Sequence, residues 1–349
     1  MKWRQEAEVN RSQAFKVMLP FIVVSFGQAS GKLPAPRTDT AQHAPLSSEA
    51  NASPPGQDSV DSQGDARYKM QVSVDEVRLI FHAVDKSGRP VNDLKPADLD
   101  LFDNEGGPGA IVALQMLKEQ PLRIGFLVDA SGSVSGDLNR SRAIAIAAAK
   151  ALMQNKSDQG LAIGFRRAWD IIQPWSRDFN AVADGIRRIG TKPDASLDGT
   201  SLFDSLWSTC HYEFRGQQED VQNILLLLSD GIDTSSHATL EQAVGACQQA
   251  HTSVFVLIST PDLSDLSMGH RTLRKLTEQT GGSVILCGGS EVEVSHAVDA
   301  LATDIRSEYQ LFYRPQNLKR DGSFHRIVLV GPPRVATIVG QSGYYALPK

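Results

Sequence analysis

Cysteine is scarce in this sequence, which has only Cys210, Cys247 and Cys287 among its 349 residues. They are too few and too scattered for a disulfide framework, and no C-x-x-C pair suggests a zinc site. Cys210 follows an apolar helical stretch and Cys247 lies in another, so we expect buried thiols that pack as small hydrophobic side chains. The alternative is one bridge with an odd thiol left over.

An excess of charge of either sign is also lacking. Lys and Arg number 35 against 40 Asp and Glu, which gives a formal net charge of -5. This balance provides neither the basic surface of a nucleic-acid-binding protein nor a strong anionic field, and it argues against nucleic acid as a partner. The hydrophobic content of 41 % can supply a sizeable core. The composition therefore predicts a soluble globular protein.

Long apolar runs are absent after the N-terminal segment, since none reaches the roughly 18 residues of a membrane helix. The first 29 residues differ from the rest: basic residues precede the apolar run Val17–Phe26, and Gly27-Gln-Ala29 offers small residues for a signal peptidase. This pattern is typical of a signal peptide at 1–29. It predicts a secreted, periplasmic or cell-envelope protein with no transmembrane span in the mature chain. The alternative is a buried or disordered N-terminal extension.

Two β-rich flanks follow from the pattern of short strands and turn residues. Residues 30–67 are rich in Pro, Ser, Ala, Gln and Asp and predict a flexible linker. Alternating segments then predict an N-terminal β unit at 68–118 and a C-terminal β segment at 309–349, which could complete one sandwich together. In the C-terminal segment, the loop between the first two strands contains the hairpin-type pair Asp321-Gly322. The expected strands are Gln71–Val74, Val77–Val84, Leu99–Phe102, Ile111–Leu114, Tyr309–Tyr313, Phe324–Val330 and Val335–Val339.

Between the flanks, at 119–308, apolar strands alternate with amphipathic helices. Runs such as Ile-Gly-Phe-Leu-Val and Ile-Leu-Leu-Leu-Leu lack polar alternation, as expected of parallel strands covered on both faces. The sequence predicts an α/β fold: a doubly wound, mostly parallel, Rossmann-like sheet with helices on both faces, flanked by a small β-sandwich-like unit. The expected strands are Arg123–Val128, Leu161–Phe165, Ile224–Leu228, Val254–Ile258 and Val284–Leu286. The expected helices are Leu138–Gln154, Asn180–Ile189, Ser201–Phe214, Leu240–His251, Arg271–Thr280 and Glu291–Glu308.

Oxygen-bearing side chains follow the carboxyl ends of these strands, where ligands of such sheets bind. Asp129-Ala-Ser131-Gly-Ser133 comes directly after the first buried strand, and its spacing by two sends three side chains the same way. Asp230 follows a second buried strand, and Thr200 stands at the start of a helix. Such hard oxygen ligands suit Mg²⁺, with Mn²⁺ or Ca²⁺ as alternatives. We expect a divalent metal at Asp129, Ser131, Ser133, Thr200 and Asp230.

The same residues have a structural alternative. Ser133 or Ser135 could cap the helix near Leu138, with Thr200 and Asp230 in caps or turns and no metal bound. Three loops at one sheet edge are hard to obtain from capping needs alone, which favours the metal. Ser135 and Asp137 are better interpreted as capping residues.

Other polar and aromatic residues near these motifs have simpler interpretations. Acids in the neighbouring loops are expected to be solvated, with a role in tuning the metal site as the alternative, and the histidines form no recognisable triad. The two tryptophans between strand and helix signals are expected to pack in the core, with a carbohydrate-binding platform as the alternative. The acids are Asp178, Asp198, Glu213 and Asp233, the histidines His211, His237 and His251, and the tryptophans Trp169 and Trp175.

The three metal-site segments resemble the metal-ion-dependent adhesion site of von Willebrand factor type A and integrin inserted domains. They are 126–133, 199–202 and 228–231, and all five family ligand positions hold the expected residue types. The resemblance covers about Leu122 to Glu308 and implies the fold, the metal and the binding mode. The flanks, including Asp85-Lys-Ser-Gly-Arg-Pro and Glu308-Tyr-Gln-Leu-Phe-Tyr, resemble the type A-related proteins described from Acidobacteria.

These observations predict a non-enzymatic interaction or adhesion module that binds an acidic side chain of another protein through the metal. Two carboxylates and three hydroxyls leave the cation positive and incompletely coordinated, so a partner carboxylate could complete its shell. No His or Cys stands in the motifs to make a water-activating zinc site, and no G-x-S-x-G, H-E-x-x-H or P-loop is present. The alternatives are a metal-dependent subunit of an envelope enzyme complex and a structural envelope protein with a vestigial site.

Overall fold

The computed structural model describes residues 76–104, 109–134, 136–190, 199–216, 221–258, 268–316 and 321–346, apart from the side chain of Ser133. All of them belong to one compact unit, Tyr68–Lys349. The signal-peptide and linker predictions and the strand expected at 71–74 lie outside the described residues. Among the described helices, none combines the length and apolar character needed to cross a membrane.

A six-stranded sheet in the order β6-β5-β4-β7-β8-β9 forms the centre of the α/β region. Its five strands from β5 to β9 are parallel, and β6 runs antiparallel at the edge. All side chains of β4 and β7 are buried, which is why these strands lack polar alternation. The strands are β4 (Leu122–Asp129), β5 (Gln159–Phe165), β6 (Trp169–Ser176), β7 (Gln222–Leu228), β8 (Thr252–Ile258) and β9 (Val284–Leu286).

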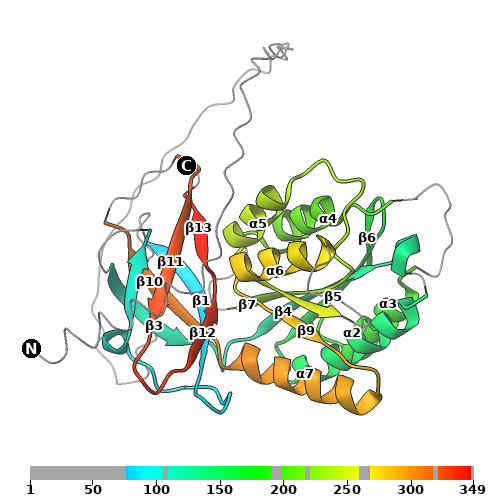
Figure 1. The fold of residues 1–349 in the computed structure, drawn as a ribbon. Helices are drawn as coiled ribbons and strands as arrows, with labels where there is room; N and C mark the ends of the chain where they lie inside the picture. Colours follow the sequence, from blue (N-terminus) through cyan, green and yellow to red (C-terminus); the bar gives the residue numbers. More distant parts are fainter. Residues whose placement is uncertain are drawn as a thin grey trace, which may run out of the picture. The chain divides into compact units, whose positions relative to one another are not determined.

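Helices cover both faces of this sheet (Figure 1). Residues of α2, α3 and α7 share a hydrophobic cluster with one face, and residues of α4, α5 and α6 share a cluster with the other. This arrangement confirms the predicted doubly wound fold class. The helices are α2 (Leu138–Leu152), α3 (Phe179–Arg188), α4 (Leu202–Ser208), α5 (Leu240–Gln249), α6 (Met268–Thr280) and α7 (Glu291–Arg306). The single helix expected at 201–214 instead divides into α4 and a π-helical segment, Thr209–Phe214.

The strand β6 was not predicted from the sequence. Pro174 interrupts its pattern, but a residue without a backbone N–H is tolerated on an edge strand. Trp169 and Trp175 are half-buried and pack against the cluster on the α4 face, in line with the expected core packing.

Strands from both flanks form two antiparallel sheets, in the orders β12-β1-β10-β3 and β13-β11-β2. The N-terminal β1 pairs with the C-terminal β10 and β12, and Leu79, Phe81, Leu101 and Leu311 lie in their common core. Because β10 and β11 belong to different sheets, the loop with Asp321-Gly322 is not a hairpin turn. The strands are β1 (Val77–Val84), β2 (Asp100–Asp103), β3 (Ala110–Met116), β10 (Tyr309–Arg314), β11 (Phe324–Val330), β12 (Thr337–Gly340) and β13 (Gly343–Tyr345).

The expectation of unpaired thiols is wrong for two of the three cysteines. Cys210 and Cys247 form a disulfide, with their Cα atoms 4.9 Å apart and a sequence separation of 37. The physical reason is tertiary: α5 packs beside α4 and the π-helical segment on one face of the sheet, which brings the two positions together. Cys287 is a free, buried thiol.

Candidate functional site

Asp129 lies at the centre of the candidate site, at the carboxyl end of β4. Its side chain is almost fully buried, at 1 % exposure. The hydroxyl of Ser229 donates to its Oδ2 at 2.8 Å, and the backbone N–H of Ser131 donates to its Oδ1 at 2.9 Å. The parallel register Val128↔Leu228 explains the first contact, because Asp129 and Ser229 each follow one of these paired residues at the carboxyl ends of β4 and β7.

The electrostatic environment of Asp129 opposes its negative charge. Burial raises the pKa of the carboxyl group, hydrogen bonds from Ser131 and Ser229 oppose that rise, and the nearby carboxylate of Asp230 adds to it. A buried anion beside a second anion is costly unless a positive group offsets it. The contacts that the structure gives Asp129 come from hydroxyls and an amide, none of them cationic.

Asp230 brings the second carboxylate to this edge. Its Oδ1 accepts from the N–H of Ile232 at 3.0 Å, and its Oδ2 makes no hydrogen bond with the described residues. Gly231 follows with φ of 77°, and a Cβ there would lie 2.5 Å from the carbonyl oxygen of Gly269. Only glycine permits this turn against α6.

Thr200 presents a hydroxyl from the loop before α4. Its backbone N–H donates to the Thr234 hydroxyl at 2.9 Å, and its carbonyl accepts from the N–H groups of Thr234 and Ser235. The Thr200 hydroxyl itself has no hydrogen-bond partner in the described parts of the chain, although the residue is only 5 % exposed. Gly199 precedes it with φ of 111°, and a Cβ there would lie 2.2 Å from the Ser235 hydroxyl oxygen.

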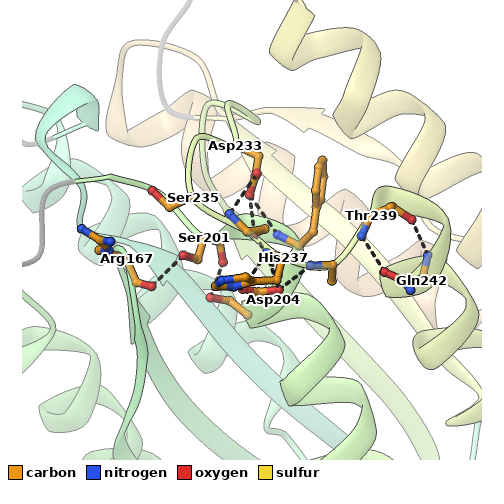
Figure 2. Close-up of polar contacts among 12 residues, drawn as sticks. Arg167, Ser201, Asp204, Asp233, Ser235, His237, Thr239 and Gln242 are labelled. Carbon is orange, nitrogen blue, oxygen red and sulfur yellow. Dashed lines mark hydrogen bonds and ion pairs between the residues drawn. The ribbon is translucent and has the colours of Figure 1, made fainter. Parts of the chain in front are cut away.

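The loop after Asp230 is attached to the first turn of α4 by a set of contacts that we call the α4 clamp. Its residues are Asp204, Asp233, Ser236, His237 and Ala238, and Figure 2 labels Asp204, Asp233 and His237. The carboxylate of Asp204 accepts from the N–H of His237 at 3.0 Å and of Ala238 at 2.7 Å. Burial opposes ionisation of Asp204, but these bonds outweigh it and lower its pKa. Asp233 accepts from the N–H of Phe203 at 3.3 Å. The clamp therefore holds the Thr200 and Asp230 loops together.

The end of β5 connects Thr200 to Asp129. The carbonyl of Phe165 accepts from the N–H of Ala130, and the carbonyl of Arg166 accepts from the N–H of Ser201, at 2.9 and 2.7 Å. The three predicted loops thus meet at the carboxyl edge of the sheet.

The remaining predicted residues of the first loop are less fully described. Gly132–Val134 forms a short 3-10 turn, so the backbone of Ser133 is placed but its side chain is not described, and Ser135 lies outside the described residues. Asp137 occupies the position before α2, but its side chain accepts no hydrogen bond from that helix. The capping role expected of its side chain is therefore wrong.

Three of the four acids expected to be solvated have structural partners. Asp233 belongs to the α4 clamp, the Asp178 carboxylate accepts from the N–H of Asn180 at the start of α3, and Glu213 accepts from the indole N–H of Trp175. Asp198 lies outside the described residues. Sequence reasoning also missed Ser229 as the partner of Asp129 and Asp204 as the centre of the α4 clamp. The signal for Ser229 was its position one residue past the β7 pattern.

The donor set fits a hard cation. Within the described ranges, no group of three or more His, Cys, Asp or Glu side chains is arranged to hold a metal. A site here would instead combine the carboxylates of Asp129 and Asp230 with hydroxyls, which suits Mg²⁺ and similar ions rather than zinc in a closed site.

Residues 124–232, which include most of β4, all of β7 and the three loops, match the family model of the von Willebrand factor type A domain. This matched part of the chain is a von Willebrand factor type A domain. Solved structures resemble this chain in fold at low sequence identity. Proximal thread matrix protein 1 from the mussel byssus is 15 % identical with a TM-score of 0.43, over 56 % of this chain and 50 % of that chain. This chain thus spans about half the length of the mussel protein.

Two bacterial structures resemble this chain to a similar degree. BatB from Bacteroides thetaiotaomicron is 13 % identical with a TM-score of 0.42, over 52 % of this chain and 97 % of that chain. A von Willebrand factor type A protein from Catenulispora acidiphila is 12 % identical with a TM-score of 0.43, over 78 % of this chain and 73 % of that chain. A search of curated proteins finds no match.

Proposed function

We propose that the type A domain binds a divalent cation and uses it to bind an acidic side chain of a partner protein. The residues that would hold the cation are Asp129, Ser131, Ser133, Thr200 and Asp230. Mg²⁺ is the first choice, and Mn²⁺ and Ca²⁺ are alternatives. The observation that carries the proposal is the meeting of three groups at one sheet edge: the buried Asp129 carboxylate, the second carboxylate of Asp230, and the Thr200 hydroxyl, which has no hydrogen-bond partner among the described residues.

The protein residues account for the affinity and the orientation of the site. Asp129 and Asp230 supply two negative charges whose mutual repulsion a cation would relieve. Ser229 orients Asp129, and the α4 clamp fixes Thr200 relative to Asp230. When bound, the cation would supply a Lewis-acidic position for one carboxylate of the partner.

Recognition is favoured over catalysis because, among the residues that the structure describes, no group that activates a nucleophile contacts these oxygens. His237 is the histidine of the adjoining loop, and its ring contacts the carboxylate of Asp204 at 3.1 Å while its side chain is 97 % exposed. That geometry serves the α4 clamp. We therefore propose an interaction or adhesion module with no enzymatic activity of its own.

Export belongs to the same proposal. The disulfide between Cys210 and Cys247 is of a kind that persists in oxidising compartments, which supports a secreted, periplasmic or cell-envelope location. The closer relationship to the type A-related proteins of Acidobacteria, carried by the flanking strands, is also part of the proposal.

The test combines metal binding with recovery of the partner. Calorimetry with Mg²⁺ and Mn²⁺ should give binding heat for the wild type and for Asp299→Ala, a matched control in which an exposed acid of α7 is removed, and none for Asp129→Ala. A pull-down from envelope extracts should recover a partner with the wild type and the control, and lose it with Asp129→Ala or a chelator. Equal recovery of the partner in all samples would contradict the proposal. Absence of heat and of a thermal shift would favour a vestigial site, and metal-dependent turnover in a hydrolase screen would favour the enzyme-complex alternative.

A further inference from the structure

Arginines gather at the carboxyl edge of the central sheet, beside the candidate metal site. Two follow β5 and two lie in the first turns of α2, although the chain as a whole has a net charge of -5. Three of the four donate to backbone carbonyls of neighbouring segments. These are Arg140 to Gly289 at 3.1 Å, Arg142 to Ile189 at 2.9 Å and Arg166 to Gly190 at 3.4 Å.

Arg167 differs from these three. It is exposed, and its guanidinium makes no hydrogen bond or ion pair with any residue that the structure describes. Its backbone, in contrast, is held firmly, because its carbonyl accepts from the Ser201 hydroxyl at 2.6 Å. Figure 2 shows this carbonyl directed at Ser201 and the guanidinium nitrogens on the opposite side.

The anchoring of Arg167 sets it beside the candidate metal ligands. Ser201 follows Thr200 directly, and the carbonyl of Phe165 accepts from the residue that follows Asp129. A segment of three residues, Phe165–Arg167, is therefore bonded to the backbones of both ligand loops. The long side chain of Arg167 extends from this rigid point into solvent.

We propose that Arg167 binds a second carboxylate of the partner, so that the type A domain recognises an acidic segment carrying two carboxylates. This inference rests on the proposed function, in which the first carboxylate binds the cation. A guanidinium presents a planar fork that matches a carboxylate, and an arginine without an internal partner loses no existing bond when it binds one. In an extended segment, residues two or three positions apart have backbones about 7–10 Å apart. We therefore take Asp-x-Asp and Asp-x-x-Asp as the two ligand patterns to test.

The charges around Arg167 support an acidic partner. The nearby carboxylates of Asp204 and Asp233 accept hydrogen bonds within the α4 clamp, so they do not pair with Arg167. Arg167 itself contributes an exposed positive charge at this edge, which favours encounter with an acidic segment at low salt.

The experiment uses the purified full chain with Mg²⁺ and synthetic peptides whose ends are acetylated and amidated. One glycine-based peptide carries a single Asp, and two others carry two Asp residues separated by one or two glycines. Binding is followed by NMR titration of the wild type, Arg167→Ala, Arg167→Lys and Arg177→Ala. Arg177 is a matched control: it is also exposed and has no side-chain partner in the described structure, but it follows the far end of β6.

The wild type and Arg177→Ala should bind one of the two-Asp peptides about two- to fivefold more tightly than the single-Asp peptide, the range expected of an exposed ion pair. Arg167→Ala should lose this preference and keep its affinity for the single-Asp peptide, and Arg167→Lys should retain only part of it. Equal affinity of the wild type for all peptides, or a preference that survives Arg167→Ala, would overturn the inference and leave the proposed function standing. If no peptide binds in Mg²⁺, the proposed function fails and the inference with it.

Discussion

The hydroxyl of Ser229 donates a hydrogen bond to Oδ2 of Asp129 at 2.8 Å and so joins the carboxyl ends of two neighbouring strands. The same hydroxyl accepts from the N–H of Gly231 at 3.1 Å, which orients it. Ser229 thus aligns the one deeply buried carboxylate of the candidate site while leaving lone pairs of that carboxylate available.

Ser229→Ala should therefore weaken Mg²⁺ binding without removing any proposed ligand. Loss of a hydrogen bond to a metal-binding carboxylate commonly costs about 10-fold or more in affinity. Calorimetry measures the effect, and Ser229→Thr, which keeps the hydroxyl, should bind nearly as the wild type does. Unchanged affinity in Ser229→Ala would show that Asp129 needs no such orientation, or that it is not a ligand.

Asp204→Asn should loosen the α4 clamp. The substitution removes the charge that accepts the backbone N–H groups of His237 and Ala238, and hydrogen bonds to charged groups contribute about 1.5–3 kcal/mol. Because the carboxylate is partly exposed, we expect the free energy of unfolding to fall by about 1 kcal/mol and Mg²⁺ affinity to fall with it. The control is His237→Ala, which keeps both backbone donors and removes only an exposed ring. If His237→Ala has the larger effect, the ring contact and not the backbone bonds holds the loop.

Reduction of the Cys210–Cys247 disulfide should destabilise the domain. The bridge joins residues with a sequence separation of 37 and so lowers the conformational entropy of the unfolded chain. In the chain-entropy model this stabilises the folded state by about 3–4 kcal/mol. Urea unfolding with and without dithiothreitol measures the loss, and the double variant Cys210→Ala/Cys247→Ala should be insensitive to the reductant. Cys287→Ser should remain sensitive to it. A wild type whose unfolding midpoint is the same in both buffers would contradict the prediction.

Glu308→Gln should change how stability depends on pH. Glu308 follows α7 and is fully buried; burial raises its pKa to about 8, a hydrogen bond from Gln222 opposes the rise, and the charge of Asp304 adds to it. The folded state therefore holds a proton that the unfolded glutamate, with a pKa of about 4.3, releases. The stability contributed by this proton is complete below the unfolded pKa and is lost as the pH rises toward 8.

The glutamine variant keeps the neutral side chain at every pH. Relative to the wild type, its free energy of unfolding should increase from about pH 5 and level off above about pH 8, as urea unfolding across that range can measure. Glu278→Gln, at an exposed glutamate of α6, should show no such trend. A constant difference between Glu308→Gln and the wild type would mean that Glu308 is ionised throughout.

The buried strands of the central sheet could be predicted closely, because a strand that is buried on both faces consists almost wholly of apolar residues. β9 was predicted without error, and β4 and β7 to within two residues at each end, from runs of branched apolar residues. The same criterion failed for β6, since an edge strand with one half-buried face and a proline has no such run. The division of the helix expected through Phe214 was not predicted, because a π-helical segment needs no change in the apolar pattern.

By itself, the sequence determined which chemical groups stand at the ends of the buried strands. Asp129 and Asp230 follow apolar runs whose parallel pairing leaves their carboxyl ends at one edge, so their proximity followed from local pattern and topology. Only the tertiary structure decided which of their oxygens are already bonded. Register set Ser229 opposite Asp129, helix packing joined Cys210 to Cys247, and the α4 clamp fixed the Thr200 loop. The physical reason is that these contacts join residues far apart in the chain, and local periodicity carries no information about which distant partners will meet.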